Sequence, residues 1–258
     1  MKKRVTIDGG AVVYVLEHPV RERGDSKKAR AEKKKATGEA QAMRNRILST
    51  RELELRLSKN FPTAGSGLVV VLTFDDGHMP KTRAQAQRRM KYFLKLLREA
   101  RAEAGLPEPR VIYTPEVLTS VSGRWHFHGV VDSTGRDMEM IRRCWIYGDD
   151  VDIAPLRVDD KKNHETLARY MTKELREAQE YECRPGLHGW SCTRSCLKPE
   201  VDEQIVEDRK QLRAPKGAVV LMQERRSTEF AESAILKYRL PEEVFRTRPK
   251  ARRKRRTC

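Results

Sequence analysis

The most regular pattern of apolar and polar positions lies in the middle of the chain. Residues 67–74 form an apolar, β-branched run followed by Asp75-Asp76-Gly77, which is typical of a buried strand. From 81 to 104 apolar residues recur at helical spacing before Gly105, so we predict a helix that ends there. The same criteria predict further strands at 110–118, 125–131 and 151–158 and helices at 137–147 and 163–180.

These elements follow one another in the order β-α-β-β-α-β. That order is typical of an antiparallel sheet covered by its two connecting helices. We therefore predict an α+β fold with a ferredoxin/RRM-like antiparallel sheet and helices packed on one face.

The two ends of the chain follow a different pattern. Two short apolar runs around Asp8-Gly9 predict a hairpin, and a charged, Ala-rich helix is expected to end near Asn60. Residues 246–258 hold eight basic side chains and no acid, so we expect a disordered basic tail. We divide the chain into a basic N-terminal extension (1–62), a central domain (63–200), a C-terminal accessory segment (201–243) and the tail (244–258).

Charge and composition narrow the class of protein. The chain carries 54 Lys and Arg against 37 Asp and Glu, a formal net charge of +17, which favours a polyanionic partner such as nucleic acid. Its longest apolar run, 68–72, is far shorter than the ~20 residues that span a bilayer. The early apolar stretch is broken at Asp8, and the five cysteines are odd in number and lack paired spacing. We expect a cytoplasmic protein.

Two histidines in the third predicted strand are candidate metal ligands. Alternate strand residues share a face, so His126 and His128 project together while Phe127 points into the core. Glu116 on the preceding strand would add a carboxylate, and two imidazoles with one carboxylate suit a divalent ion, Mn²⁺ or Mg²⁺. Such a pair of histidines also occurs in proteins where it only makes hydrogen bonds.

A tyrosine and a lysine in the last predicted helix are candidate catalytic residues. Tyr170 and Lys173 are three residues apart, so both lie on one helix face. If that helix packs beside the sheet, a phenol and an ammonium approach the proposed metal. Most Tyr-x-x-Lys pairs on helices have no such role, and the nearby histidine pair is what makes this one informative.

The segment from Trp190 to Pro199 is polar, basic and led by an aromatic residue, which suits phosphate binding. It is also compatible with an ordinary surface loop. A second hypothesis for this region is a zinc site, although the spacing of its cysteines does not match paired Cys-x-x-Cys motifs. That site would use Cys183, His188, Cys192 and Cys196.

Together these motifs resemble the HUH endonucleases, and within them the rolling-circle replication initiators of phages and plasmids, especially the filamentous-phage-like branch. The resemblance covers roughly 45–199. One departure is Cys196, where relatives often carry asparagine, and the absence of a second tyrosine one turn from Tyr170 favours the single-tyrosine type. The similar segments are Val71–Phe74, Glu116, Gly123–Trp125, His126–His128, Trp145–Gly148, Tyr170–Lys173 and Trp190–Pro199.

The resemblance implies a site-specific, metal-dependent nickase and strand transferase. Tyr170 would attack a phosphodiester of single-stranded origin DNA and form a 5′-phosphotyrosine, and Lys173 would stabilise the phosphate. Glu116, His126 and His128 would hold the metal. A host helicase and polymerase in a bacterial cytoplasm would be partners. Residues expected to contact DNA are Arg124, Arg169, Trp190, Arg194 and Lys198.

Two other readings stay open. The same site could serve a relaxase or a transposase, although common relaxases place the tyrosine before the histidines and Tyr170 comes after them. The chain could also be a non-catalytic nucleic-acid-binding module on an RRM-like sheet. That module needs aromatic residues exposed on the sheet, and the aromatic content is 6%.

Overall fold

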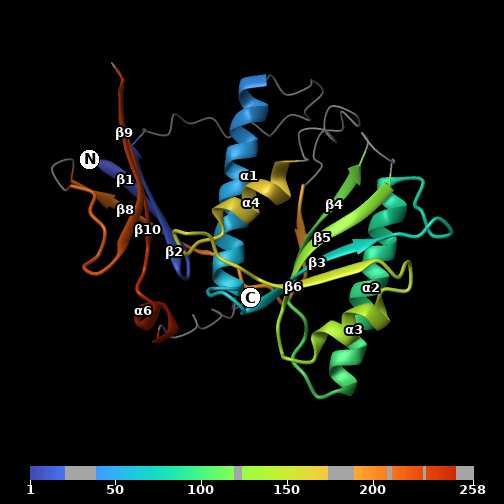
Figure 1. The fold of residues 1–258 in the computed structure, drawn as a ribbon. Coiled ribbons are helices and arrows are strands. Elements are labelled where there is room, and N and C mark those ends of the chain that lie inside the picture. The colour runs from blue at the N-terminus through green and yellow to red at the C-terminus, as the bar shows by residue number, and fades with distance from the viewer. Residues whose placement is uncertain (21–38, 119–123, 174–188, 208–210, 229–230, 248–258) are drawn as a thin grey trace, which may run out of the picture. The chain divides into compact units, whose positions relative to one another are not determined.

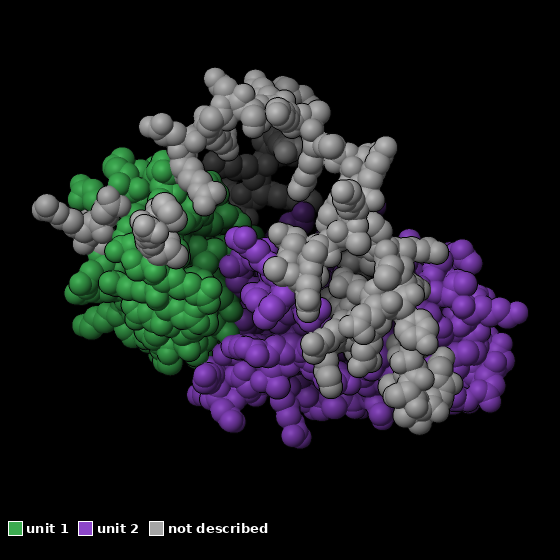
Figure 2. Space-filling view, turned by 90° about the horizontal axis from the view of Figure 1, so that it is seen from above, with its two compact units in different colours: residues 1–22, 199–258 green, residues 23–198 purple. Residues whose placement is uncertain are grey.

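The computed structural model describes residues 1–20, 39–118, 124–173, 189–207, 211–228 and 231–247. The chain forms two compact units, one of residues 1–22 and 199–258 and one of residues 23–198 (Figure 2). Both contain an antiparallel sheet, so the fold is α+β, as predicted. None of the helices in the described part of the chain is long and apolar enough to cross a membrane.

The first unit joins the two ends of the sequence in one five-stranded sheet of order β8-β1-β2-β10-β9. The predicted hairpin is confirmed: β1 pairs with β2 around Gly10, whose backbone φ of 81° suits glycine and whose amide donates to Asp8. Its elements are β1 (Lys2–Gly9), β2 (Val12–Pro19), β8 (Glu200–Val206), β9 (Val219–Thr228), β10 (Ala231–Arg239) and α6 (Glu242–Thr247).

One face of this sheet carries the core of the first unit. Val13, Val15, Leu236 and Tyr238 alternate along β2 and β10 on that face, and Leu212 packs on them. The expected extension at 1–62 and accessory segment at 201–243 are therefore not separate parts. Their strands pair with each other, because neither hairpin buries its apolar face alone.

The second unit contains the predicted central domain. Its sheet has the order β6-β3-β5-β4-β7, and all neighbouring strands are antiparallel (Figure 1). The predicted strands and helices are present, with α1 added from the predicted N-terminal extension. The elements are α1 (Glu39–Asn60), β3 (Gly67–Thr73), α2 (Arg83–Glu103), β4 (Val111–Leu118), β5 (Arg124–Asp132), α3 (Asp137–Cys144), β6 (Val151–Pro155), α4 (Glu165–Lys173) and β7 (Ser191–Cys192).

Helices cover both faces of this sheet, so the prediction of helices on one face is wrong. On one face, α2 and α3 pack over Val70, Phe127 and their neighbours. On the other, α1 and α4 pack over Ile112 and Val130 (Figure 1). The reason is that β3 is apolar on both sides and that Ile112 and Val130 extend its second apolar side, so each side needs a helix layer.

Several helices and strands end at other residues than predicted. The helix expected at 137–147 ends at Cys144, because Trp145 turns into the core and donates its indole N–H to the carbonyl of Thr73. The strand expected to reach 158 ends at Pro155. The expected helix at 163–180 is described only as far as Lys173. The first residues of the expected tail, 244–247, belong to α6, and 248–258 lie outside the described residues.

Candidate metal centre and neighbouring tyrosine

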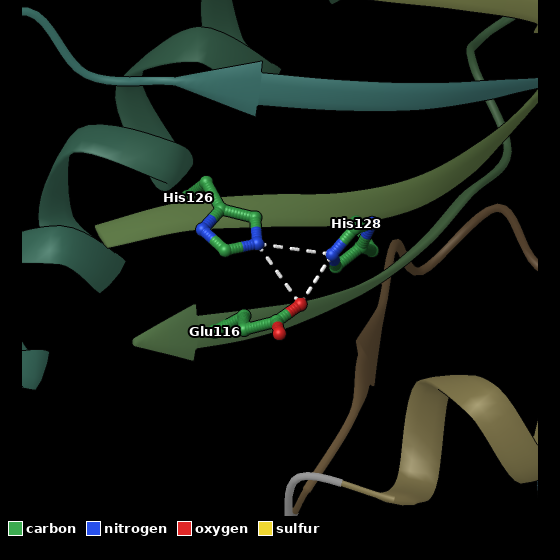
Figure 3. A group of neighbouring side chains, drawn as sticks. All are labelled: Glu116, His126 and His128. Carbon is green, nitrogen blue, oxygen red and sulfur yellow. Dashed lines mark hydrogen bonds and ion pairs between the residues drawn. The ribbon is translucent and has the colours of Figure 1, made fainter. Parts of the chain in front are cut away.

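Three side chains from two adjacent strands meet on the α1/α4 face of the second sheet. β4 pairs with β5 so that Glu116 lies opposite His126 and Thr114 opposite His128. Because alternate strand residues share a face, both imidazoles and the carboxylate point to the same side. Figure 3 shows them directed at one another across the two strands.

The ligand atoms of this trio converge. Nε2 of His126 lies 3.0 Å from Nε2 of His128 and 2.9 Å from a carboxylate oxygen of Glu116, which also contacts His128. All three atoms lie within 4.8 Å of one another. Among the described residues this is the one group of histidine, cysteine and acidic side chains with such geometry, and it could hold a metal ion.

Burial and charge suit this donor set to a cation. Glu116 is 8% exposed and His126 is 6% exposed. Burial would raise the pKa of Glu116, but the hydrogen bonds and charges of His126 and His128 outweigh it and lower the pKa to about 2. The carboxylate is therefore ionised at neutral pH. No lysine or arginine among the described residues pairs with it.

Tyr170 stands at the edge of this group. Its hydroxyl lies 3.3 Å from Nε2 of His128, and the two rings meet edge to face with centroids 5.1 Å apart. The residue is 50% exposed, so its phenol faces solvent as well as the trio. Burial of the phenol and the negative charge of Glu116 raise the pKa of Tyr170, and the hydroxyl therefore keeps its proton at neutral pH.

The position of Tyr170 depends on how α4 packs against α1. Ala168 and Met171 belong to the apolar cluster under the helix, and the hydroxyls of Thr172 and Thr50 lie 2.8 Å apart. At the start of α4, Nε2 of buried His164 lies 2.6 Å from the carbonyl of Phe61. His164 had no role in the sequence interpretation, since a lone histidine carries no signal of such a contact.

The other predicted residues on β5 and α4 are basic. Arg124 lies two residues before His126 on the same side of β5 and pairs with Asp76. Arg169 pairs with Glu165 within α4, and its side chain is 72% exposed. Lys173 is the last residue of α4, and its side chain lies outside the described residues.

The three predicted DNA contacts after α4 lie elsewhere in the second unit. Trp190 is partly buried against α1, where its indole donates to Ser49 and the Arg56 guanidinium lies 5.8 Å from the ring centroid. Arg194 and Lys198 are exposed on the segment that follows β7. Within the described residues, no hydrogen bond, ion pair or ring contact joins these three residues to the trio.

Two of the four ligands of the alternative zinc site, Cys183 and His188, lie outside the described residues. Cys192 and Cys196 are described, as free thiols. The Cys196 thiol donates a hydrogen bond to the carbonyl of Val111 at 3.5 Å. The two sulfurs alone do not make a zinc site, which needs four ligands.

Comparison of this chain with protein-family models, with curated proteins and with solved structures finds no match.

Proposed function

We propose that this protein is an HUH-type endonuclease that nicks and rejoins single-stranded DNA and so starts rolling-circle replication. The observation that carries the proposal is the 3.3 Å separation between the Tyr170 hydroxyl and Nε2 of His128, within a converging His-His-carboxylate group. A nucleophile beside a candidate cation site is the arrangement that transesterification of a phosphodiester requires.

The strand arrangement supports the same proposal. The four longer strands of the second sheet have the order β6-β3-β5-β4, with α2 and α3 on one face. This agrees with the ferredoxin-like connection expected from the sequence. The additional helices α1 and α4 lie on the opposite face, where α4 carries the tyrosine.

The donor set fits a divalent ion. Two imidazoles and one ionised carboxylate would bind Mn²⁺ or Mg²⁺ through Glu116, His126 and His128. When bound, such an ion supplies a Lewis acid that polarises the scissile phosphate and offsets its negative charge.

Tyr170 is the nucleophile in this proposal. Its Oη forms a bond to phosphorus while the bond from phosphorus to the 3′ oxygen breaks. The phenol loses its proton in this step, and the leaving 3′ oxygen gains one. The products are a 5′-phosphotyrosine and a free 3′-OH. One phosphodiester replaces another, so the same atoms can react in reverse and reseal the strand.

The remaining residues would bind and orient the strand. Arg124 lies beside the trio on β5, and Arg169 lies next to Tyr170 on α4, so both can neutralise phosphates that flank the scissile one. Lys173 would stabilise the reacting phosphate. The 3′-OH would prime a host polymerase, and a separate helicase would supply the unwound strand.

A Tyr170→Phe variant tests the proposal directly. Wild-type protein is incubated with Mn²⁺ and a library of single-stranded oligonucleotides, and covalent adducts are detected by denaturing gel and mapped by mass spectrometry. We expect an adduct on Tyr170 and none with Tyr170→Phe. Tyr92→Phe, which removes the hydroxyl of a 43% exposed tyrosine on α2, is the matched control and should react normally. An adduct that persists in Tyr170→Phe would contradict the proposal.

A non-catalytic module of the RRM kind is less well supported. Such modules bind bases on an uncovered sheet face with exposed aromatic residues. In the second unit, both faces of the sheet are covered by helices, and Phe127 is 1% exposed.

A further inference from the structure

The solvent-facing side of α2 carries a row of basic side chains. This helix contains seven basic and two acidic residues. Residues three and four apart lie on one face of a helix, and four of the seven basic residues follow that spacing. All four are exposed, and we call them the α2 stripe. The α2 stripe consists of Arg88, Lys91, Lys95 and Arg98.

The opposite side of α2 is fixed to the second sheet, so packing sets the direction in which the α2 stripe points. Met90, Phe93 and Leu97 are each 0% exposed and belong to the apolar cluster between the helix and the sheet. Near the end of the helix, the guanidinium of Arg101 pairs with two buried carboxylates. The α2 stripe is therefore held on a rigid element.

Little of the charge of the α2 stripe is neutralised by the protein itself. Lys95 lies 3.8 Å from the carboxylate of Glu99. Among the described residues, no carboxylate pairs with the other three members of the stripe. Like charges three and four residues apart destabilise a helix, and the α2 stripe contains three such pairs in succession. The first turn of α2 also lacks the acidic residues that a helix dipole favours. A bound polyanion would relieve this repulsion.

The dimensions of the α2 stripe fit a double helix. With a rise of about 1.5 Å per residue, Arg88 and Arg98 are about 15 Å apart along the helix axis. Double-stranded DNA carries one negative charge per about 1.7 Å of its axis, and its major groove, about 12 Å wide, admits an α-helix. Each of the four cations can therefore meet a phosphate.

The α2 stripe is less suited to a single strand. Sites for single-stranded nucleic acid stack successive bases on exposed aromatic side chains. Of the two aromatic residues of α2, Phe93 is buried and Tyr92 is 43% exposed. The ammonium of Lys95 lies 6.0 Å from the centroid of the Tyr92 ring. The α2 stripe thus offers a row of charges and no row of rings.

We propose that the α2 stripe binds the sugar-phosphate backbone of double-stranded DNA. α2 covers the face of the second sheet opposite to the face that carries the trio of Glu116, His126 and His128, so both sites can be occupied at once (Figure 1). This binding surface does not depend on the proposed nicking activity and needs no metal.

The salt dependence of DNA binding tests the proposal. Fluorescence anisotropy measures the affinity of the full-length protein for a labelled duplex of arbitrary sequence, in chelator, over about 50–200 mM KCl. Each phosphate contact contributes about 0.9 to the slope of log affinity against log salt. Replacing the whole α2 stripe by glutamine should therefore lower the magnitude of the slope by about 3–4 and weaken binding at 100 mM salt by at least about tenfold.

A matched variant controls for net charge. It also replaces four exposed basic residues by glutamine, but in the first unit, and should bind the duplex with nearly the wild-type slope. The replaced residues are Arg213, Lys216, Arg225 and Arg226. A single-stranded oligonucleotide of the same length should lose clearly less affinity than the duplex when the α2 stripe is replaced.

Two further variants separate binding from folding. Glutamine is a good helix former and removes the repulsion between like charges, so the quadruple α2 variant should melt at or above the wild-type temperature. Lys91→Arg/Lys95→Arg keeps the charge and should bind like the wild type. Should the quadruple variant melt early, single glutamine variants decide, each lowering the slope by about one. A wild-type slope in folded α2 variants, an equal loss in the first-unit control, or an equal loss for the single strand would overturn the proposal.

Discussion

The hydroxyl of Tyr170 lies 3.3 Å from Nε2 of His128, although the two residues are 42 positions apart in the chain and belong to a helix and a strand. The strand pairing aligns the imidazoles with Glu116, and the packing of α4 on α1 brings the phenol to them. The candidate centre therefore depends on two interfaces, one between strands and one between helices.

The first prediction concerns metal affinity. His126→Ala removes one of three converging donors, so the affinity for Mn²⁺ should fall by at least about tenfold, since even the partners of metal ligands change affinity by about 10–100-fold. Isothermal titration calorimetry after dialysis against a chelator measures this change. His78→Ala, on an exposed loop after β3, is the control and should bind like the wild type. Equal affinity of His126→Ala and the wild type would rule out the proposed ligand set.

The second prediction concerns a buried ion-pair network between α2, β5 and α3. The guanidinium of Arg101 is 0% exposed and pairs with Asp132 at 2.8 Å and with Asp137 at 2.6 Å. Arg101→Met would leave the buried carboxylate of Asp137 without its cation and Asp132 with Arg110 alone, so we expect a loss of about 3–5 kcal/mol in the free energy of unfolding. Urea denaturation measures it, with Arg98→Met on the exposed face of the same helix as control. A similar loss in both variants would contradict this role of Arg101.

The third prediction concerns the close approach of two backbones after α3. A Cβ at Gly148 would lie 2.5 Å from the carbonyl oxygen of Thr73 and 2.9 Å from the amide of Asp75. Both obstacles are backbone atoms, so Gly148→Ala should lower the free energy of unfolding by about 1–3 kcal/mol. Gly77→Ala is the comparison, because its added Cβ would meet only an Asp75 side-chain oxygen at 3.5 Å. Thermal unfolding measures the melting temperature of each variant. Wild-type melting temperatures for both variants would contradict the prediction.

The fourth prediction concerns pH. Burial lowers the pKa of His164 below its ordinary value of 6.5, so the folded protein keeps this imidazole neutral where the unfolded chain has bound a proton. The neutral imidazole makes its full contribution to stability above pH 6.5. This contribution decreases as the pH falls below that value. His164→Gln should therefore lose less stability than the wild type between pH 7.5 and 5. Urea unfolding at the two pH values gives this difference, and an equal loss in both proteins would refute the prediction.

Much of the second unit follows from local sequence pattern. The apolar run at 67–73 and the helical spacing at 83–103 each predict an element that is present. Because the side chains of a strand alternate, the spacing of His126 and His128 places both imidazoles on one face. A short connection between β4 and β5 then brings Glu116 opposite them. These relationships need only the periodicity of a strand and one antiparallel pairing.

Tertiary structure alone decided the rest. The pairing of β1 with β8 and of β2 with β10 joins segments about 200 residues apart, and such pairing leaves no local signal in the sequence. The second helix layer covers Val69, Ile112 and Val130, and the strand pattern alone does not indicate which helices pack on these residues. Local periodicity is enough to tell which residues share a strand or helix face. Long-range packing determined which faces meet, because contact between distant segments is set by the shape and burial of whole elements.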